Sequence, residues 1–111
     1  MRKHKYQEDF YKYMKRDIHS MKNSLADVKE EIRNRYKAEI IGIFGSYARG
    51  EEKDDSDIDV LVKFLKGASL FDFVGLADFL EEKLHEKVDV VPMDTVRDEI
   101  REEVFKEAIY L

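Results

Sequence analysis

The chain has 111 residues, a formal net charge of −5 and 41% charged residues. This length fits one small domain and excludes two independent hydrophobic cores. The absence of cysteine excludes a disulfide scaffold, thiolate chemistry and a Cys-based zinc site. No apolar run approaches the ~20 residues that span a bilayer. The basic start of the chain is followed by no apolar segment of the kind found in secretion signals, so we expect a soluble cytoplasmic protein.

Charge is distributed unevenly along the chain. Residues 1–22 carry a net charge of +4, and residues 23–111 carry −9. Because nucleic-acid binding needs clustered cations to neutralise phosphates, the acidic body argues against strong nucleic-acid binding. Any phosphate compound would have to be bound at a local site.

Residues 6–36 contain no glycine or proline and are predicted to be helical. Ser24 with Asp27 resembles a capping box and could break this helix at Asn23–Ser24. Two alternatives stay open: a long arm whose apolar stripe docks on a partner chain or a second copy, or two short helices folded over the sheet of one monomer. The stripe recurs every three or four residues and consists of Tyr6, Phe10, Tyr13, Met14, Ile18, Met21, Leu25, Val28 and Ile32.

Three short apolar runs predict strands, at residues 38–44, 57–64 and 87–91. Pro92 is expected to stop the last of them. The connection of roughly 20 residues between the second and third strands permits them to run parallel.

Two further helices are predicted after the second strand. Ser69 is expected to cap the first, which runs to about residue 86. Its predicted apolar face consists of Leu70, Phe73, Val74, Ala77, Leu80 and Leu84. The last helix begins at Asp94 or Thr95, with an apolar face of Val96, Ile100, Val104 and Ala108. This order of elements predicts an α/β (α+β) fold, with a small sheet of three or more strands and helices packed on it.

The segment Gly45–Gly50 directly follows the first predicted strand and opens a helical turn. Glycine at this place lets the backbone come close to a ligand. Free N–H groups at the helix start, together with the Ser46 hydroxyl, would form an anion cradle. Taken alone, the segment also fits a tight strand-to-helix turn with a surface Arg49.

Three carboxylates lie in the second and third predicted strands. Asp57 and Asp59 are two residues apart, so they project from one face, opposite the apolar residues that alternate with them. Asp89 is a lone acid in the third strand and approaches both if the two strands are neighbours. Three carboxylates around one point suit Mg²⁺, which prefers oxygen ligands. A pair of such ions would clamp the attacking and leaving oxygens of phosphoryl or nucleotidyl transfer.

These segments together resemble a known signature. Gly45-Ser46, ten residues, then Asp57-Ile58-Asp59-Val60 resembles the motif of the DNA polymerase beta-type nucleotidyltransferase superfamily. The string GSYARGEEKDDSDIDVLV, the later KVDVV and the ending REEVFKEAIYL are similar to its minimal nucleotidyltransferase (MNT) branch. The resemblance covers residues 38–111 and implies a small mixed sheet with helices packed on it. It divides the chain into an N-terminal helical extension, residues 1–36, and a minimal nucleotidyltransferase domain, residues 37–111.

The resemblance also implies a role for each site residue. Gly45 and Ser46 would hold the triphosphate of ATP. Asp57 and Asp59 would ligate Mg²⁺, as a pair of ions, and Asp89 would be the third acid and the base for the acceptor hydroxyl. Arg49 would contact phosphate, or else form a salt bridge to the acidic loop that comes after it.

Many stand-alone domains of this branch are similar to antitoxins paired with a HEPN-domain ribonuclease toxin, and some add AMP to a tyrosine of the toxin. The function implied for this chain is transfer of AMP from ATP to a tyrosine hydroxyl of such a partner. Two alternatives stay open: a catalytically silent module of the same fold that neutralises a partner by contact, and a small-molecule transferase of the antibiotic-modifying kind. Residues 1–22 form a basic and aromatic N-terminal segment that is longer than this branch usually needs. The N-terminal helix could mediate homo- or hetero-oligomer formation.

Overall fold

A four-stranded mixed sheet organises the part of the chain that the computed structural model describes, residues 18–53 and 55–111. Its strands are β1 (Ala38–Phe44), β2 (Ile58–Phe64), β3 (Val88–Pro92) and β4 (Ile109–Tyr110). Their order across the sheet is β3-β2-β1-β4. β1 pairs antiparallel with β2 and β4, whereas β2 and β3 are parallel. The predicted α/β fold with a small sheet is therefore confirmed, and the connection between β2 and β3 produces the parallel pair that its length permitted.

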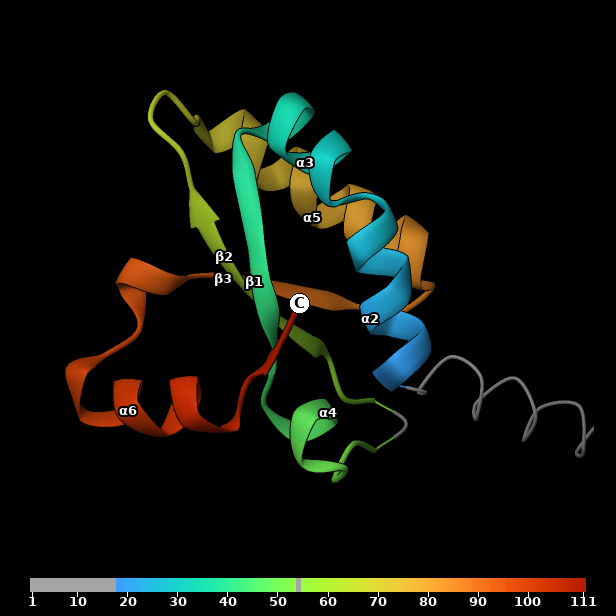
Figure 1. The fold of residues 1–111 in the computed structure, drawn as a ribbon, viewed down its shortest axis with the longest axis vertical. Coiled ribbons are helices and arrows are strands. Elements are labelled where there is room, and N and C mark those ends of the chain that lie inside the picture. The colour runs from blue at the N-terminus through green and yellow to red at the C-terminus, as the bar shows by residue number, and fades with distance from the viewer. Residues whose placement is uncertain (1–17, 54) are drawn as a thin grey trace, which may run out of the picture.

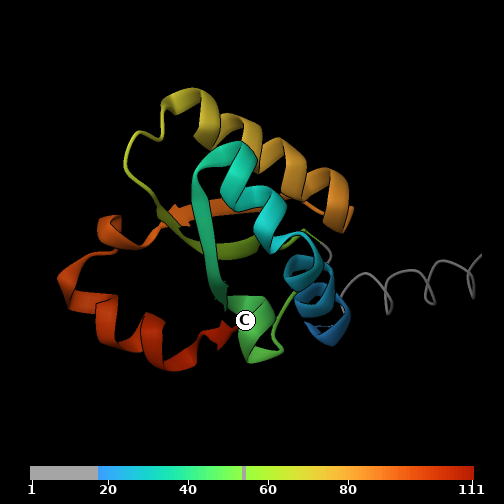
Figure 2. The same ribbon diagram turned by 45° about the horizontal axis from the view of Figure 1, so that its top comes forward.

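The helices lie on both faces of this sheet (Figure 1, Figure 2). One face carries α2 (Ile18–Asp27), α3 (Lys29–Tyr36) and α5 (Leu70–Leu84). The other is covered in part by the turn η1 (Met93–Thr95) and by α6 (Asp98–Glu107). The short helix α4 (Ser46–Arg49) lies in the connection from β1 to β2. Within the described residues, no helix is both long enough and apolar enough to cross a membrane.

The alternation of side chains along β2 separates two hydrophobic clusters. Ile58, Val60 and Val62 are fully buried in the larger cluster, under α2, α3 and α5. Leu61 points the other way and is buried against residues of the smaller cluster on the α6 side. Because side chains alternate along a strand, Asp59 shares the face of Leu61. Asp59 therefore lies on the face of the sheet that α6 covers in part.

The N-terminal helices break at Val28, four residues beyond the predicted break at Asn23–Ser24. α2 continues through Ser24 to Asp27, and Val28 caps α3 without a side-chain hydrogen bond. Val28 is buried at the turn, so packing on the sheet sets this break in place of a polar cap. Residues 18–36 thus form two short helices over the sheet of one monomer. The upstream part of the predicted stripe, residues 6–17, lies outside the described residues.

Helix α5 begins as predicted and buries most of its predicted face, since Leu80 and Leu84 are buried and Phe73 and Ala77 pack against the core. The Ser69 hydroxyl accepts a hydrogen bond from the backbone N–H of Asp72, and the Asp72 carboxylate accepts one from the N–H of Ser69. Leu70 is 76% exposed and Val74 is 52% exposed, so the prediction that they face the core was wrong. The first turns of α5 are apolar on several sides, and spacing alone could not select the buried one. The buried residues are Leu76, Leu80 and Leu84.

The last helix begins later than predicted. Pro92 is the last residue of β3, and η1 precedes α6, which begins at Asp98. Val96, Val104 and Ala108 are buried as predicted, although Val96 and Ala108 lie just outside α6. Ile100 is 48% exposed, so its predicted place on the apolar face was wrong.

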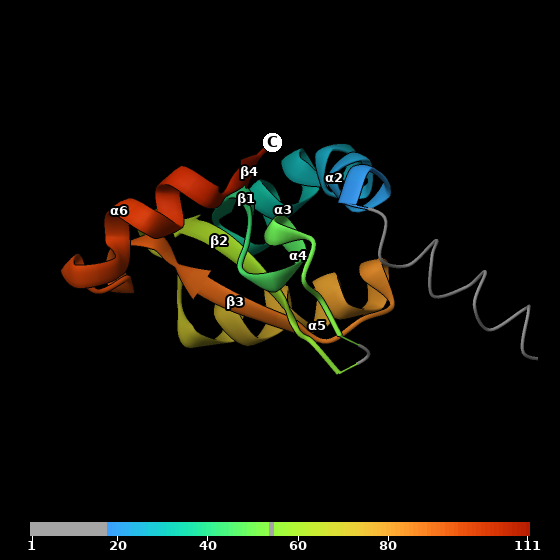
Figure 3. The ribbon, with the colours of Figure 1, turned by 90° about the horizontal axis from the view of Figure 1, so that it is seen from below.

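After α6 the chain returns to the sheet as β4, alongside β1 (Figure 3). No strand was predicted here, because two residues are too few for a recognisable pattern. Gly42 permits the close approach of the two strands, because a Cβ there would lie 2.5 Å from the carbonyl oxygen of Ile109.

We expect Gly42→Ala to destabilise the protein, because the added methyl group would push β4 away from β1. The cost should be about 1–3 kcal/mol, as for other overpacked sites, measured by urea unfolding. The same substitution in a chain ending at Ala108 is the control, since the opposing backbone of Ile109 is then absent. An equal penalty in both chains would contradict this explanation.

Candidate functional site

The turn after β1 brings the backbone against an acidic side chain of β2. Gly45 has a φ of 76° and ψ of −152°, a conformation that glycine adopts readily and L side chains do not. A Cβ on Gly45 would lie 2.1 Å from Oδ2 of Asp59. No side chain fits between them, so the Asp59 carboxylate rests directly against this turn. Ser46 is the first residue of α4 and is half-buried.

Asp59 and Asp89 are direct neighbours across the sheet. They are register partners in the parallel β2–β3 pair, and Phe44 is the partner of Asp59 on β1. Neighbouring strands lie ~4.8 Å apart and paired residues share a face. Asp57 comes just before β2 and is exposed. Asp89 is also exposed, so it is not enclosed by the apolar residues of its strand.

The surroundings of Asp59 disfavour its charge. Burial, together with repulsion from Asp89 and then Asp57, raises the pKa of Asp59 to about 6 from an ordinary value of 3.8. Arg49 acts in the opposite direction, and the charge of Glu107 adds to the increase. The carboxylate form of Asp59 is therefore under-compensated, a state that a bound cation would relieve.

The carboxylates of Asp57, Asp59 and Asp89 are of the ligand type that binds divalent cations. Carboxylate oxygens are the ligands that Mg²⁺ prefers, and the repulsion acting on Asp59 is one that such an ion would offset. In the arrangement observed, residues 18–53 and 55–111 contain no group of three or more acidic or histidine side chains close enough to hold a metal ion. The convergence of Asp57, Asp59 and Asp89 on metal stays a prediction.

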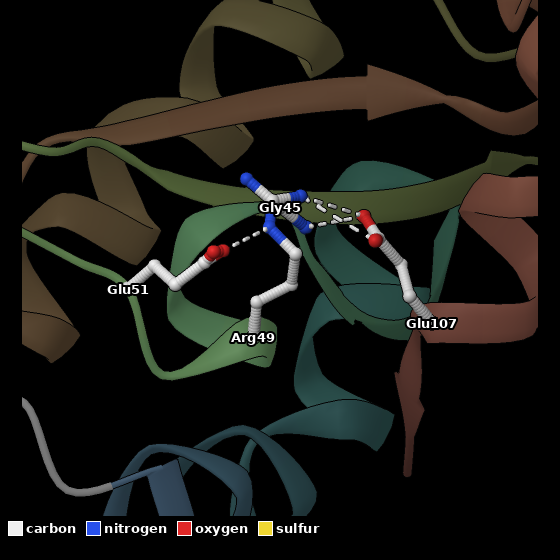
Figure 4. A network of polar contacts seen from close by, with 4 residues as sticks. All are labelled: Gly45, Arg49, Glu51 and Glu107. Carbon is white, nitrogen blue, oxygen red and sulfur yellow. Dashed lines mark hydrogen bonds and ion pairs between the residues drawn. The ribbon is translucent and has the colours of Figure 1, made fainter.

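Arg49 forms the salt bridge that was one of its two predicted roles. Its Nε lies 3.1 Å from Oε1 of Glu51 in the acidic loop, and its Nη1 lies 3.1 Å from Oε1 of Glu107 (Figure 4). Its guanidinium is therefore shared between two carboxylates. It is also close enough to lower the pKa of Asp59.

Sequence reasoning missed Glu107, the last residue of α6. The backbone N–H of Gly45 donates a hydrogen bond to Oε1 of Glu107 at 3.3 Å, across 62 positions in the chain. In the sequence, Glu107 is one of several acids in a helix, and its spacing does not separate it from a solvent-facing residue. The one signal was its place in the C-terminal string that resembles the MNT branch.

Comparisons with known proteins agree on one family. Residues 25–111 match the model described as a nucleotidyltransferase domain. The chain is 38% identical to protein adenylyltransferase MntA of Thermococcus cleftensis over 94 residues, which cover 85% of this chain and 95% of that protein. A solved structure described as a putative minimal nucleotidyltransferase superposes with a TM-score of 0.65 and 38% identity, covering 80% of this chain and 94% of the other. A crystal structure of a toxin–antitoxin with AMP-PNP gives a TM-score of 0.62 and 25% identity, covering 79% and 69%.

We expect Asp59→Asn to stabilise the fold near neutral pH. Because the folded-state pKa of Asp59 is raised to about 6, its contribution to stability is full below its unfolded pKa and is lost as the pH rises through the folded value. For a half-buried carboxyl, the variant should gain on the order of 1–2 kcal/mol at about pH 8 and nothing at about pH 4.

Urea unfolding across this pH range checks that expectation. The exposed Asp94→Asn is a matched control for loss of one acid away from the site. A stability difference for Asp59→Asn that does not change with pH would show that repulsion at this carboxylate is not its source.

Proposed function

The chain belongs to the nucleotidyltransferase domain family, and we propose that within it the chain is a Mg²⁺-dependent protein adenylyltransferase. It would transfer AMP from ATP to a hydroxyl of a partner protein. The observation that carries this proposal is the position of Asp59, which rests against Gly45 on one side and pairs with Asp89 on the other. The glycine turn after β1 and two acids thereby lie together at one point of the sheet.

The acceptor proposed here is a tyrosine hydroxyl. In the transfer, the hydroxyl oxygen bonds to the α-phosphorus of ATP, the bond to the leaving pyrophosphate breaks, and the hydroxyl proton passes to the carboxylate of Asp89. Asp89 is exposed at the surface, which gives an acceptor carried by another protein access to the base. A base enclosed in a narrow pocket would instead suit a small acceptor.

The remaining site residues would bind the nucleotide. Asp57, Asp59 and Asp89 would hold the Mg²⁺ ions, which supply positive charge to the phosphates when bound. Gly45 and Ser46 would hold the triphosphate through the backbone N–H and the hydroxyl, and Arg49 would contribute its guanidinium. The under-compensated charge of Asp59 supports the metal role, because a cation is what that carboxylate lacks.

The partner is proposed from the relatives. One is named protein adenylyltransferase MntA, and another belongs to a toxin–antitoxin structure with AMP-PNP. These names support an antitoxin role for this chain. A HEPN-domain toxin as the protein that it modifies, and a place in the cytoplasm, are proposed from the resemblance to the minimal nucleotidyltransferase branch. Contact through the N-terminal helical extension, residues 1–36, belongs to the same proposal.

A catalytically silent binding module is the second candidate. The observation that favours it is the engagement of Arg49 by Glu51 and Glu107, which leaves its guanidinium shared between two acids before any phosphate arrives. Such a module would bind its partner without transferring AMP.

Labelled ATP separates the two candidates. With ATP labelled at the α-phosphate, Mg²⁺ and the product of the neighbouring gene, the wild-type chain should transfer label to the partner. Asp59→Asn should lower the rate by several orders of magnitude, about 10³-fold or more, because charge stabilisation by bound metal is lost. Removal of Mg²⁺ by a chelator should have the same effect.

Asp94→Asn is the control for this assay, since it removes an exposed acid outside the site. Full transfer by Asp59→Asn would contradict the enzyme proposal. Partner binding by the wild-type chain with no transfer of label would favour the silent module.

A further inference from the structure

The backbone on both sides of Glu107 is fixed by secondary structure. It ends α6, and the next residue, Ala108, donates its backbone N–H to the carbonyl of Val104. β4 then pairs with β1, with Ile109 opposite Ile43. The backbone at Glu107 is therefore fixed by a helix end and a strand, and its side chain is directed toward the turn after β1 (Figure 4).

The Glu107 carboxylate takes hydrogen bonds from two different kinds of donor. Oε1 accepts from the backbone N–H of Gly45 at 3.3 Å and from Nη1 of Arg49 at 3.1 Å. Oε2 lies 3.4 Å from the same Nη1. A backbone N–H and a guanidinium are also the donors that bind phosphate oxygens in proteins. The carboxylate thus occupies, with its own oxygens, the positions in which an oxyanion ligand would be bound.

The charge of Glu107 acts on the rest of the site as well. Together with Asp89 and Asp57, it disfavours the ionised form of Asp59. The negative charge of Glu107 would repel the triphosphate of an incoming nucleotide from the Gly45 N–H and the Arg49 guanidinium, the donors that would bind it. The Glu107 side chain is 29% exposed, so it is not locked in the core and has solvent on one side.

We propose that Glu107 sets the nucleotide affinity of this chain by competing with phosphate for Gly45 and Arg49. The inference rests on the proposed binding of nucleotide at these residues. In the free protein the carboxylate neutralises Arg49, and nucleotide binding requires its displacement. Glu107→Gln removes the charge but keeps the length and a carbonyl oxygen that can accept from Gly45, so nucleotide should bind more tightly to this variant.

Calorimetric titration with AMP-PNP and Mg²⁺, and separately with inorganic tripolyphosphate, measures the effect. The Kd of Glu107→Gln should be about three- to tenfold lower than that of the wild type for both probes, in line with loss of one charge-assisted competitor. Glu102→Gln is the matched control, because Glu102 is an exposed acid of the same helix. Its Kd should change less than about twofold, as expected for a screened surface charge.

The amide resonance of Gly45 gives a readout independent of affinity. In ¹⁵N spectra, Glu107→Gln without ligand and tripolyphosphate added to the wild type should both shift this resonance, because each removes the carboxylate from the N–H. Glu107→Asp keeps the charge but shortens the side chain, so it should give a smaller gain in affinity. It tests the same idea if Glu107→Gln does not fold.

The outcomes separate this inference from the proposed function. Equal or weaker binding by Glu107→Gln, with the wild type binding both probes, would overturn the competition and leave nucleotide binding intact. Binding by neither the wild type nor any variant would overturn nucleotide binding at this site, and the inference with it.

Discussion

The contact between the Gly45 backbone and the Asp59 carboxylate determines where the other polar groups of the site can lie. β1 and β2 pair with Phe44 opposite Asp59, so the chain must pass this carboxylate as it leaves β1. A side chain at Gly45 would collide with Oδ2. Because the turn is this tight, α4 starts immediately after it. Arg49, at the end of α4, forms a salt bridge with Glu107 and lowers the pKa of Asp59.

Negative charge is concentrated on the face of the sheet that carries the site. Asp59 is half-buried there, beside Asp89 and within the influence of Asp57 and Glu107. Arg49 offsets part of this repulsion. Functional sites often retain arrangements that cost folding stability, because a ligand supplies the missing interaction. The raised pKa of Asp59 is the physical consequence of such an arrangement in this protein.

Local patterns predicted much of the fold, and long-range packing accounts for what they missed. The strand at residues 38–44 and the Ser69 cap of α5 depend on neighbouring residues and were predicted correctly. The break at Val28 and the exposure of Leu70 depend on how the helices meet the sheet, which spacing does not encode. At the site, the sequence motif indicated Gly45 and the three aspartates. It did not indicate Glu107, which contacts Gly45 because the chain returns to the sheet as β4.

The topology also divides the site between contacts that are short-range and contacts that are long-range along the chain. Pairing of β1 with β2 closes only residues 45–57, so Gly45, Arg49 and Asp59 come together with a nearly local hairpin. Asp89 is brought to the site by the α5 crossover of residues 65–87, and Glu107 is brought there by the pairing of β4 with β1. Loop closure costs more entropy for these longer connections. Local opening of β4 in the native protein would then release Glu107 while the hairpin stays paired, so hydrogen exchange should be faster in β4 than in β2.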